Sequence, residues 1–516
     1  MKIKKESVGR SVGVVDLFSG PGGLGEGFSA YETEQGLNPF QIKVSIEKEQ
    51  SAHSTLLLRS FLRKFGSDFP IEYYDFLNGK RDEPDWSILY PDKWAAAKEE
   101  ALCMSLGDEN TRNIVSAKIS EINNDFNGRT LLIGGPPCQA YSLVGRSRNA
   151  GKLDYQPHLD ERNFLYEEYV NVLAELEPMV FVMENVKGML SATIKGKELF
   201  SRVKQDLESA GKRGGYRLLA LAAENDYTRS APGPSDFIIR SENYSIPQAR
   251  HRVIIVGIRR DLSGSLDTNF SLTLKKSRNQ ANVNDMISGI PRIRSGLSKN
   301  DTADGWHKAV IQAIKLVDDS CSEFSREFSQ KMRIVLRDCK ASFEAQEYLP
   351  RSPTDKGKRP SCSAALSNWI TDSRLKKLPN SDTRGHMKGD LARYMFAAIF
   401  GAAFDRSPTA SEFPEKLAPA HKNWQSGKFA DRFRVQTGGN PSSTITSHIS
   451  KDGNYYIHPD PVQCRTLTVR EAARLQTFPD NYYFKGNRTQ QYTQVGNAVP
   501  PYLARQIAEA IWPVYE

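Results

Sequence analysis

The sequence has no long apolar run. Its 516 residues are 39% hydrophobic and 25% charged, a composition ordinary for a globular protein in water. A membrane-spanning helix needs about 20 consecutive apolar residues, so we expect none. The opening MKIKKESVGRSVGVVDLFSG sets lysines before apolar residues, but the apolar part is too short for a secretory signal and breaks at glycines. We therefore expect a cytosolic protein, with monomer as the default state.

Cysteine is scarce, and its spacing excludes two kinds of site. The six cysteines are scattered, with no CxxC pair, which argues against a disulfide framework and against a zinc cluster. No metal site is expected. Thiols of a cytosolic protein stay reduced, so each cysteine is either core packing or chemically useful. The chain also has no evident internal repeat.

The positive charge is concentrated in one internal block. The chain carries a net charge of +9, and residues 262–456 contain 30 Lys and Arg against 20 Asp and Glu, so the remainder is close to neutral. A basic block beside a neutral one suggests a separate surface for a polyanion, most simply nucleic acid. A solvated, lysine-rich surface would give the same count.

Before residue 261, short apolar runs alternate with helical patterns. Helices are expected at 164–178 and 196–211, and strands at 12–18, 41–47, 130–135, 179–185, 216–225 and 252–260. Solid apolar strands alternating with helices predict a mostly parallel, doubly wound α/β sheet of the Rossmann-like kind. Residues 262–456 lack this alternation and are rich in Ser, Pro and Gly loops, so we expect a smaller, mixed second domain inserted before helices near the C-terminus.

A glycine-rich turn follows the first strand. In DLFSGPGGLGEGF (16–28) a strand ends at Phe18 and a helix starts near Leu24. Glycines let the backbone approach a ligand, and a helix N-terminus offers free N–H groups. Glu47 ends the second strand, where a carboxylate can accept both ribose hydroxyls of an adenosine group. Each feature alone also fits an ordinary connection or a surface glutamate; together they predict a nucleotide-like cofactor.

A lone thiol, Cys138, stands just past the strand of LLIGGPPCQAYS (131–142). The two prolines before it fix the backbone, so the sulfur is presented in one place. From this stretch alone, Cys138 could be core filler or a nucleophile.

With this motif the chain closely resembles the C5-cytosine DNA methyltransferases, which use S-adenosylmethionine. Four further blocks match that family in the family's order: MENVKG (183–188), IPQARHRVIIVG (246–257), RTLTVREAARLQTFPD (465–480) and QVGNAVPPYLARQIA (494–508). The resemblance implies a catalytic domain of residues 11–261 plus 457–516, and a target-recognition domain of residues 262–456 that reads duplex DNA.

The resemblance also implies the catalytic roles. Cytosine C5 is a poor nucleophile and must be activated by covalent addition at C6, for which a thiolate is suited because it attacks and leaves easily. Cys138 takes the nucleophile position. Glu184 takes the position that contacts N3 and the exocyclic amine, Arg252 the position that reaches O2, and Arg250 supports the loop or a phosphate. The target base must be rotated out of the duplex, and we expect water to remove the C5 proton.

By the same resemblance, a set of residues surrounds S-adenosylmethionine: Asp16, Phe18, Gly20, Gly22, Gly23, Leu24, Glu47, Leu165, Asn497 and Val499. The last two imply that the C-terminal helix packs back onto the first domain. One position departs from the family. The Asp-Ile pair expected about twenty residues before the cysteine is replaced, with Lys118 at the aligned position, so the contact to the adenine amine is left unassigned.

The DNA contacts implied are Gln139, Ser142, Gln248 and the Thr444-Ile445 pair. For Gln248 a framework role is favoured over a DNA contact, and Thr444-Ile445 is equally suited to an edge strand. Basic clusters such as DKGKRP and RLKKL are expected to contact phosphates. A tRNA methyltransferase and a catalytically silent DNA-binding regulator are the alternatives. The large basic insert argues against the first, and the intact Cys138, Glu184 and Arg252 argue against the second. The enzyme would be either the modification half of a restriction system, with a cognate restriction endonuclease as its partner in function, or a solitary bacterial or phage methyltransferase.

Overall fold

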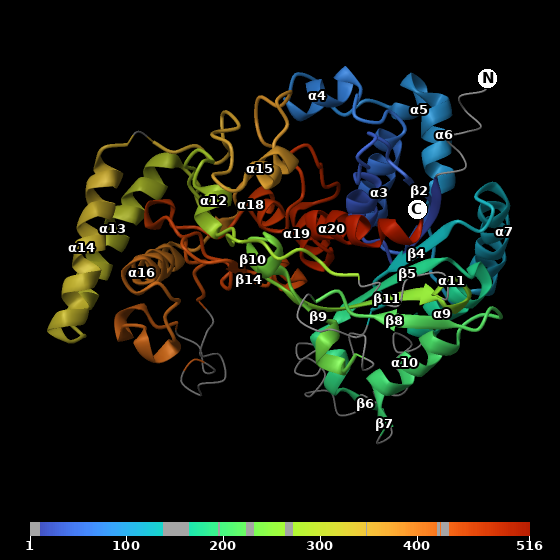
Figure 1. Cartoon of the computed structure of the whole chain (residues 1–516). Helices are drawn as coiled ribbons and strands as arrows, with labels where there is room; N and C mark the ends of the chain where they lie inside the picture. Colours follow the sequence, from blue (N-terminus) through green and yellow to red (C-terminus); the bar gives the residue numbers. More distant parts are fainter. Residues whose placement is uncertain are drawn as a thin grey trace.

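The computed structural model describes residues 11–137, 165–194, 197–222, 232–263, 272–346, 348–419, 424 and 433–516. Its main feature is an eight-stranded sheet in the order β3-β2-β1-β4-β5-β11-β8, with β9 paired to β11 (Figure 1). The strands are β1 (Val12–Leu17), β2 (Phe40–Glu47), β3 (Ala101–Cys103), β4 (Thr130–Gly134), β5 (Val180–Val186), β8 (Tyr216–Leu219), β9 (Ile238–Arg240) and β11 (His251–Arg259).

Five strands, from β3 to β5, run parallel, as the alternation predicted. The exception is β11, which lies antiparallel between β5 and β8. All six residues of β1 are buried, because helices cover both faces of the sheet. Strands buried in this way are nearly continuous apolar runs, and this is why they could be located from the sequence.

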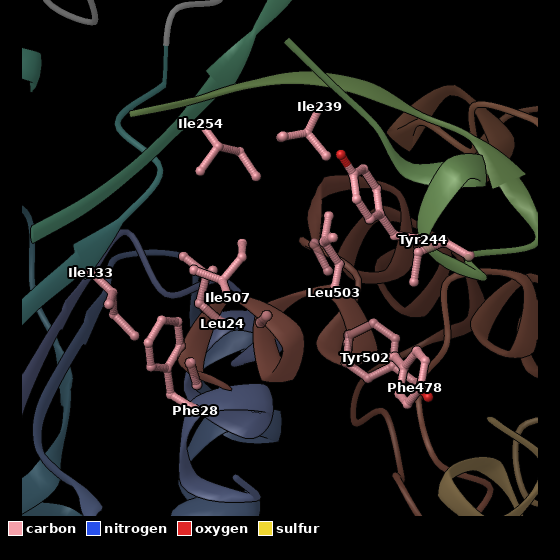
Figure 2. Close-up of a cluster of buried hydrophobic side chains, with 14 of the residues drawn as sticks. Leu24, Phe28, Ile133, Ile239, Tyr244, Ile254, Phe478, Tyr502, Leu503 and Ile507 are labelled. Atoms are coloured by element: carbon pink, nitrogen blue, oxygen red, sulfur yellow. The ribbon is translucent and has the colours of Figure 1, made fainter. Parts of the chain in front are cut away.

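Two hydrophobic clusters lie on opposite faces of the sheet. One face packs against α2 (Gly23–Ser29) and the C-terminal α20 (Pro501–Ile511), whose side chains meet Ile133 and Ile254 of the sheet (Figure 2). The other face packs against α7 (Glu109–Asp125), α9 (Leu165–Leu176) and α10 (Leu199–Ser209). The predicted return of the C-terminal helix to the first domain is thus confirmed.

The remaining elements of this part lie around the sheet. Helix α3 (Gln50–Arg63) follows β2, and three further helices come before β3: α4 (Ile71–Leu77), α5 (Trp86–Leu89) and α6 (Pro91–Glu100). The short α11 (Arg260–Ser263) follows β11, and β6 (Thr193–Ile194) pairs with β7 (Lys197–Glu198). Near the C-terminus α18 (Val469–Leu475) and α19 (Arg488–Asn497) precede α20.

The second part of the chain has its own core, which is helical where the structure describes it. Helices α13 (Ala303–Cys321), α14 (Arg326–Glu344) and α16 (Lys388–Phe404) form it. The described strands here, β12 (Gly296–Leu297), β13 (Gly385–His386) and β14 (Ser442–Ser443), have two residues each. Helices α12 (Val283–Ile287) and α15 (Ala364–Ile370) pack instead on the first part, with the C-terminal segments.

Among the described residues, no helix combines the length and the apolar character that crossing a membrane requires.

Candidate active site

Several of the predicted site residues lie at one edge of the sheet. Because β1 to β5 are parallel, their carboxyl ends share this edge, which is where ligands bind in doubly wound sheets. The glycine-rich turn follows β1, Glu47 ends β2, Gly135 follows β4, and Glu184 lies near the end of β5.

Glu184 and Arg252 form an ion pair. The Arg252 Nε lies 3.0 Å from Glu184 Oε1, and the two side chains are 16% and 13% exposed. They come from neighbouring antiparallel strands in which Arg252 pairs with Val186 and Ile254 with Glu184. The Arg252 Nη1 also donates to the carbonyl of His251 (2.9 Å). A carboxylate and a guanidinium are thereby fixed side by side while both stay partly accessible to a ligand.

The chain that leads to Cys138 passes directly beside this pair. A Cβ at Gly135 would lie 3.1 Å from Glu184 Oε2, so glycine allows the backbone close to the carboxylate. Asn185 Nδ2 donates to the carbonyl of Pro136 (3.1 Å), so this side chain holds the start of the loop against β5. Cys138, Gln139 and Ser142 lie outside the described residues, so the structure describes the approach to the thiol but not the thiol.

The turn after β1 is bound to the end of β2. Phe18, Gly20 and Gly22 all have positive φ (55°, 57° and 101°). Glycine adopts such angles without strain, whereas they are uncommon for phenylalanine. The amide of Gly20 donates to Glu47 Oε2 (2.8 Å), and the amide of Glu49 donates to Oε1 (2.7 Å). These two bonds hold the Glu47 carboxylate in one orientation at the sheet edge, and burial raises its pKa. The space beside Gly20 is open.

Asp16 lies deeper, at the end of β1. It is fully buried, and neither carboxyl oxygen has a hydrogen-bond partner among the described residues. Burial raises its pKa to about 7. A buried carboxyl without a partner is costly, so Asp16 lowers the stability of the folded protein when it is ionised.

The other predicted cofactor residues fall into two groups. The carbonyl of Val499 lies 2.3 Å from where a Cβ of Gly23 would be, so only glycine lets the C-terminal segment contact the turn. Asn497 is exposed at the end of α19, and Leu165 is half-buried at the start of α9. Leu24 differs from the expectation: it is 5% exposed and points into the apolar core (Figure 2), which makes it a packing residue.

Another acidic residue, Asp108, lies between β3 and α7. Lys118 lies within α7 and pairs with Glu121 (3.3 Å), away from the strand ends. Asp108 follows β3 and precedes α7, is exposed, and makes no side-chain capping bond. Asp108 was not predicted from the sequence, although the Gly107-Asp108 step before a helix marks its position.

Two of the expected DNA contacts are buried. Gln248 and Ile445 are both 0% exposed, and the N–H of Ile445 donates to Gln248 Oε1 (2.8 Å). They are framework residues of the protein, which corrects their assignment to the DNA surface. Thr444 is half-buried and donates to the carbonyl of Ala249 (2.7 Å).

Arg250 is also internal. It is 2% exposed, and its Nη1 donates to the carbonyls of Ile445 (2.9 Å) and Gly496 (3.4 Å). Burial, with Arg252 nearby, lowers its pKa to about 9. Of the two predicted roles, loop support is the one that this geometry fits.

Comparison with known proteins decides the family. Residues 93–512 match the family of C-5 cytosine-specific DNA methylases. The chain belongs to this family. It is 31% identical to the type II methyltransferase M.Bpa9945I of Bacillus paralicheniformis, over 96% of this chain and 98% of that protein. It is 26% identical to the type II methyltransferase M.AgeI of Thalassovita gelatinovora, with 96% and 98% covered.

A third relative, the DNA (cytosine-5-)-methyltransferase M.ApeKI of Aeropyrum pernix, is 26% identical over 76% of this chain and 84% of its own. A crystal structure described as a DNA modification methyltransferase encoded within a prophage (E. coli) aligns over 98% of this chain and 99% of its own, with a TM-score of 0.52 and 18% identity. That likeness shows the fold. The protein is thus an enzyme, a DNA (cytosine-5-)-methyltransferase.

In this methylase, the basic cluster RLKKL, which was expected to contact phosphates, packs against another part of the protein. Arg374 of RLKKL lies over the ring of Tyr74 (4.2 Å to its centroid), and Leu375 is fully buried. The cluster therefore joins the second part of the chain to α4. In the cluster DKGKRP, the Lys356 ammonium donates a hydrogen bond to the carbonyl of Ser373 (3.2 Å).

Proposed function

We propose that this methylase transfers the methyl group of S-adenosylmethionine to C5 of a cytosine flipped out of duplex DNA, through a covalent adduct between Cys138 Sγ and C6. Residues 11–261 and 457–516 would form the catalytic domain and residues 262–456 the DNA-reading domain. The observation that carries the proposal is the Glu184–Arg252 pair beside Gly135, three residues before the thiol.

The strand ends fit the proposed cofactor chemically. S-adenosylmethionine is a cation whose ribose hydroxyls and adenine amine are hydrogen-bond donors. The ends of β1, β2 and β3 carry the acceptors Asp16, Glu47 and Asp108. Gly20, with open space beside it, leaves room for a ligand near Glu47. When bound there, the cofactor supplies the methyl group.

The chain's own residues would perform the remaining steps. The Cys138 thiolate adds to C6, and the negative charge that develops in the ring is stabilised at N3 by the Glu184 carboxyl and at O2 by Arg252. Because the strand register fixes these two side chains together, a flipped base meets both at once. Water accepts the C5 proton, and the thiolate then leaves.

Similarity to relatives named type II methyltransferases along nearly their whole length supports a role in a restriction–modification system. A cognate endonuclease would then act on the same site without a stable complex. The net positive charge of residues 262–456 suits duplex DNA, where phosphate contacts supply affinity.

Labelled S-adenosylmethionine and duplex DNA test the proposal. We expect label at cytosine C5 with the wild-type protein, none with Cys138→Ala, and covalent trapping of the wild type on a 5-fluorocytosine duplex. Transfer in the Cys138→Ala variant would contradict the adduct. Transfer to tRNA in preference to DNA, measured by competition, would contradict the substrate.

A further inference from the structure

Two buried glutamines lie where distant segments of the chain meet. Gln248 belongs to β10 (Gln248–Ala249), and Gln476 directly follows α18; both side chains are 0% exposed. Gln248 Nε2 donates to Gln476 Oε1 and to the carbonyl of Leu475 (3.3 Å). A buried amide is costly unless its polar atoms are bonded, so a pair with every polar atom bonded specifies one arrangement.

Gln248 holds the segment Thr444–Thr446 of the second domain. Its Oε1 accepts from the Ile445 N–H (2.8 Å), while Arg250 donates to the Ile445 carbonyl (2.9 Å). Both polar backbone groups of Ile445 are thus bound by side chains of β10 and the residue after it. The same stretch of chain continues into β11 and reaches Arg252 two residues later.

Gln476 holds a third segment. Its Nε2 donates to the carbonyls of Val495 (3.0 Å) and Ala498 (2.8 Å). Between them, a Cβ at Gly496 would lie 2.3 Å from Ser447 N, so α19 contacts the chain just after Thr446 directly. Val499, which follows Ala498, packs against Gly23. The amide pair therefore lies between the second domain, the catalytic strand and the turn after β1.

We propose that Gln248 and Gln476 are positioning residues for methyl transfer: the buried pair fixes Thr444–Thr446 in register with Arg252, so that a cytosine selected by the second domain arrives beside the Glu184–Arg252 pair. This inference rests on the proposed function, in which that pair receives the base and the second domain reads DNA.

The test compares cognate with altered DNA. Bisulfite sequencing of DNA methylated by the wild type gives the target site. The kcat and KM of Gln248→Met and Gln476→Met are then measured on that duplex and on one with a single changed base pair. Methionine keeps the length of glutamine but has no amide. Because a buried polar group is left unbonded, we expect the cognate kcat/KM to fall about tenfold or more. The ratio of cognate to altered rates falls with it, while S-adenosylhomocysteine affinity of Gln248→Met changes by less than about threefold.

Two further variants separate positioning from general damage. Gln494 is similarly buried (2% exposed), but it bonds Thr55 Oγ1 (2.6 Å) and the Lys485 carbonyl (2.9 Å). We expect Gln494→Met to lower thermal stability and to leave the discrimination ratio unchanged. Gln248→Glu keeps the acceptor for Ile445 and should retain more discrimination than Gln248→Met; it also serves as the folded variant if methionine prevents folding.

An active wild type with an unchanged discrimination ratio in the glutamine variants would overturn the positioning role alone. A wild type that places no methyl group at C5 would overturn the proposed function itself, so the two failures are distinguishable.

Discussion

Glu184 and Arg252 are close because two strands are paired in one register. The antiparallel pairing of β5 with β11 brings the carboxylate within 3.0 Å of the guanidinium Nε. A buried or half-buried charge pair stabilises little on its own, because desolvation offsets much of the Coulomb attraction. Its retention at a ligand-binding edge is therefore better explained by chemistry than by stability.

Replacing Glu184 with glutamine tests that explanation. An amide cannot share an acidic proton with N3, so we expect kcat of Glu184→Gln to fall by about 10²–10⁴-fold, with the unfolding midpoint little changed. Single-turnover methylation and urea unfolding measure the two effects. The control is Glu168→Gln, which breaks the ion pair with Arg112 on the protein surface and should leave kcat as it is. Equal losses in both variants would contradict a catalytic role for Glu184.

Asp16 makes stability depend on pH. Its pKa is raised from 3.8 to about 7 by burial, so the folded state binds this proton more tightly than the unfolded state. Its stabilising contribution is therefore complete below pH 4 and is lost as pH rises through 7, by about 4 kcal/mol at most. Arg63, which opposes the shift, and Glu47 and Glu100, which add to it, are the charged groups that act on it.

In the Asp16→Asn variant this loss should disappear. We expect urea unfolding at pH 5 and pH 8 to show a smaller decline in stability for Asp16→Asn than for the wild type. The control is Asp92→Asn at an exposed position; because it keeps Asp16, its stability should decline between the two pH values as much as that of the wild type. Parallel declines in wild type and Asp16→Asn would show that the Asp16 carboxyl is not protonated in the folded protein.

The helices α2 and α20 approach so closely that glycine is required between them. A Cβ at Gly27 would lie 2.3 Å from the carbonyl of Pro501 and 2.5 Å from the Ala504 Cβ. The cluster that these helices share with the sheet includes Phe28, Leu503 and Ile507 (Figure 2). Most of this face of the sheet is therefore covered by a helix that arrives from the far end of the chain.

We expect Gly27→Ala to destabilise the protein by about 1–3 kcal/mol, because overpacking must separate the two helices. The control is Gly389→Ala in α16, where the nearest atom to the added Cβ is the flexible end of Arg393, 3.6 Å away. There alanine should stabilise by up to about 1 kcal/mol through helix propensity. Denaturant unfolding measures both, and destabilisation of similar size at both positions would contradict the packing argument.

The central strands and their flanking helices could be predicted from the sequence. Runs such as 12–18 and 130–135 became β1 (Val12–Leu17) and β4 (Thr130–Gly134), because a strand covered on both faces must be apolar throughout. The site residues of the motifs lie at the ends of these strands, so their grouping followed from a parallel sheet.

Other features depend on contacts that no local pattern encodes. Gln248 and Ile445 were predicted to contact DNA, but both are buried. They are buried because α18, α19 and residues 442–446 pack against β10. Asp108 was not predicted because its position depends on where β3 ends and α7 begins. The place of β11 between β5 and β8 is likewise set by packing.

In the whole molecule, side chains of helices α4 to α6 pack with residues 372–375 of the second part of the chain, and we call this contact the attachment. In Figure 1, α4 is the one of these helices that lies toward α15 of the second part. Tyr74 Oη donates to Asp372 Oδ2 (2.7 Å), and Asn481 Nδ2 donates to the same oxygen (2.8 Å). Beside them, Leu375 inserts into a cluster with Phe61 and Tyr73 and is fully buried. One leucine of residues 262–456 thus lies in a core built by residues of the first part of the chain.

This attachment should set how firmly the second domain is held over the strand ends. Leu375→Ala leaves a cavity in the shared cluster and should cost about 2–5 kcal/mol of stability. Because the cluster lies away from the Glu47 edge, we expect DNA affinity to fall more than S-adenosylhomocysteine affinity, measured by fluorescence anisotropy and calorimetry. Ile88→Ala in nearby α5, where the side chain is 75% exposed, should change stability by less than about 0.5 kcal/mol. Equal loss of both affinities in Leu375→Ala would contradict a specific role of this cluster in holding residues 262–456.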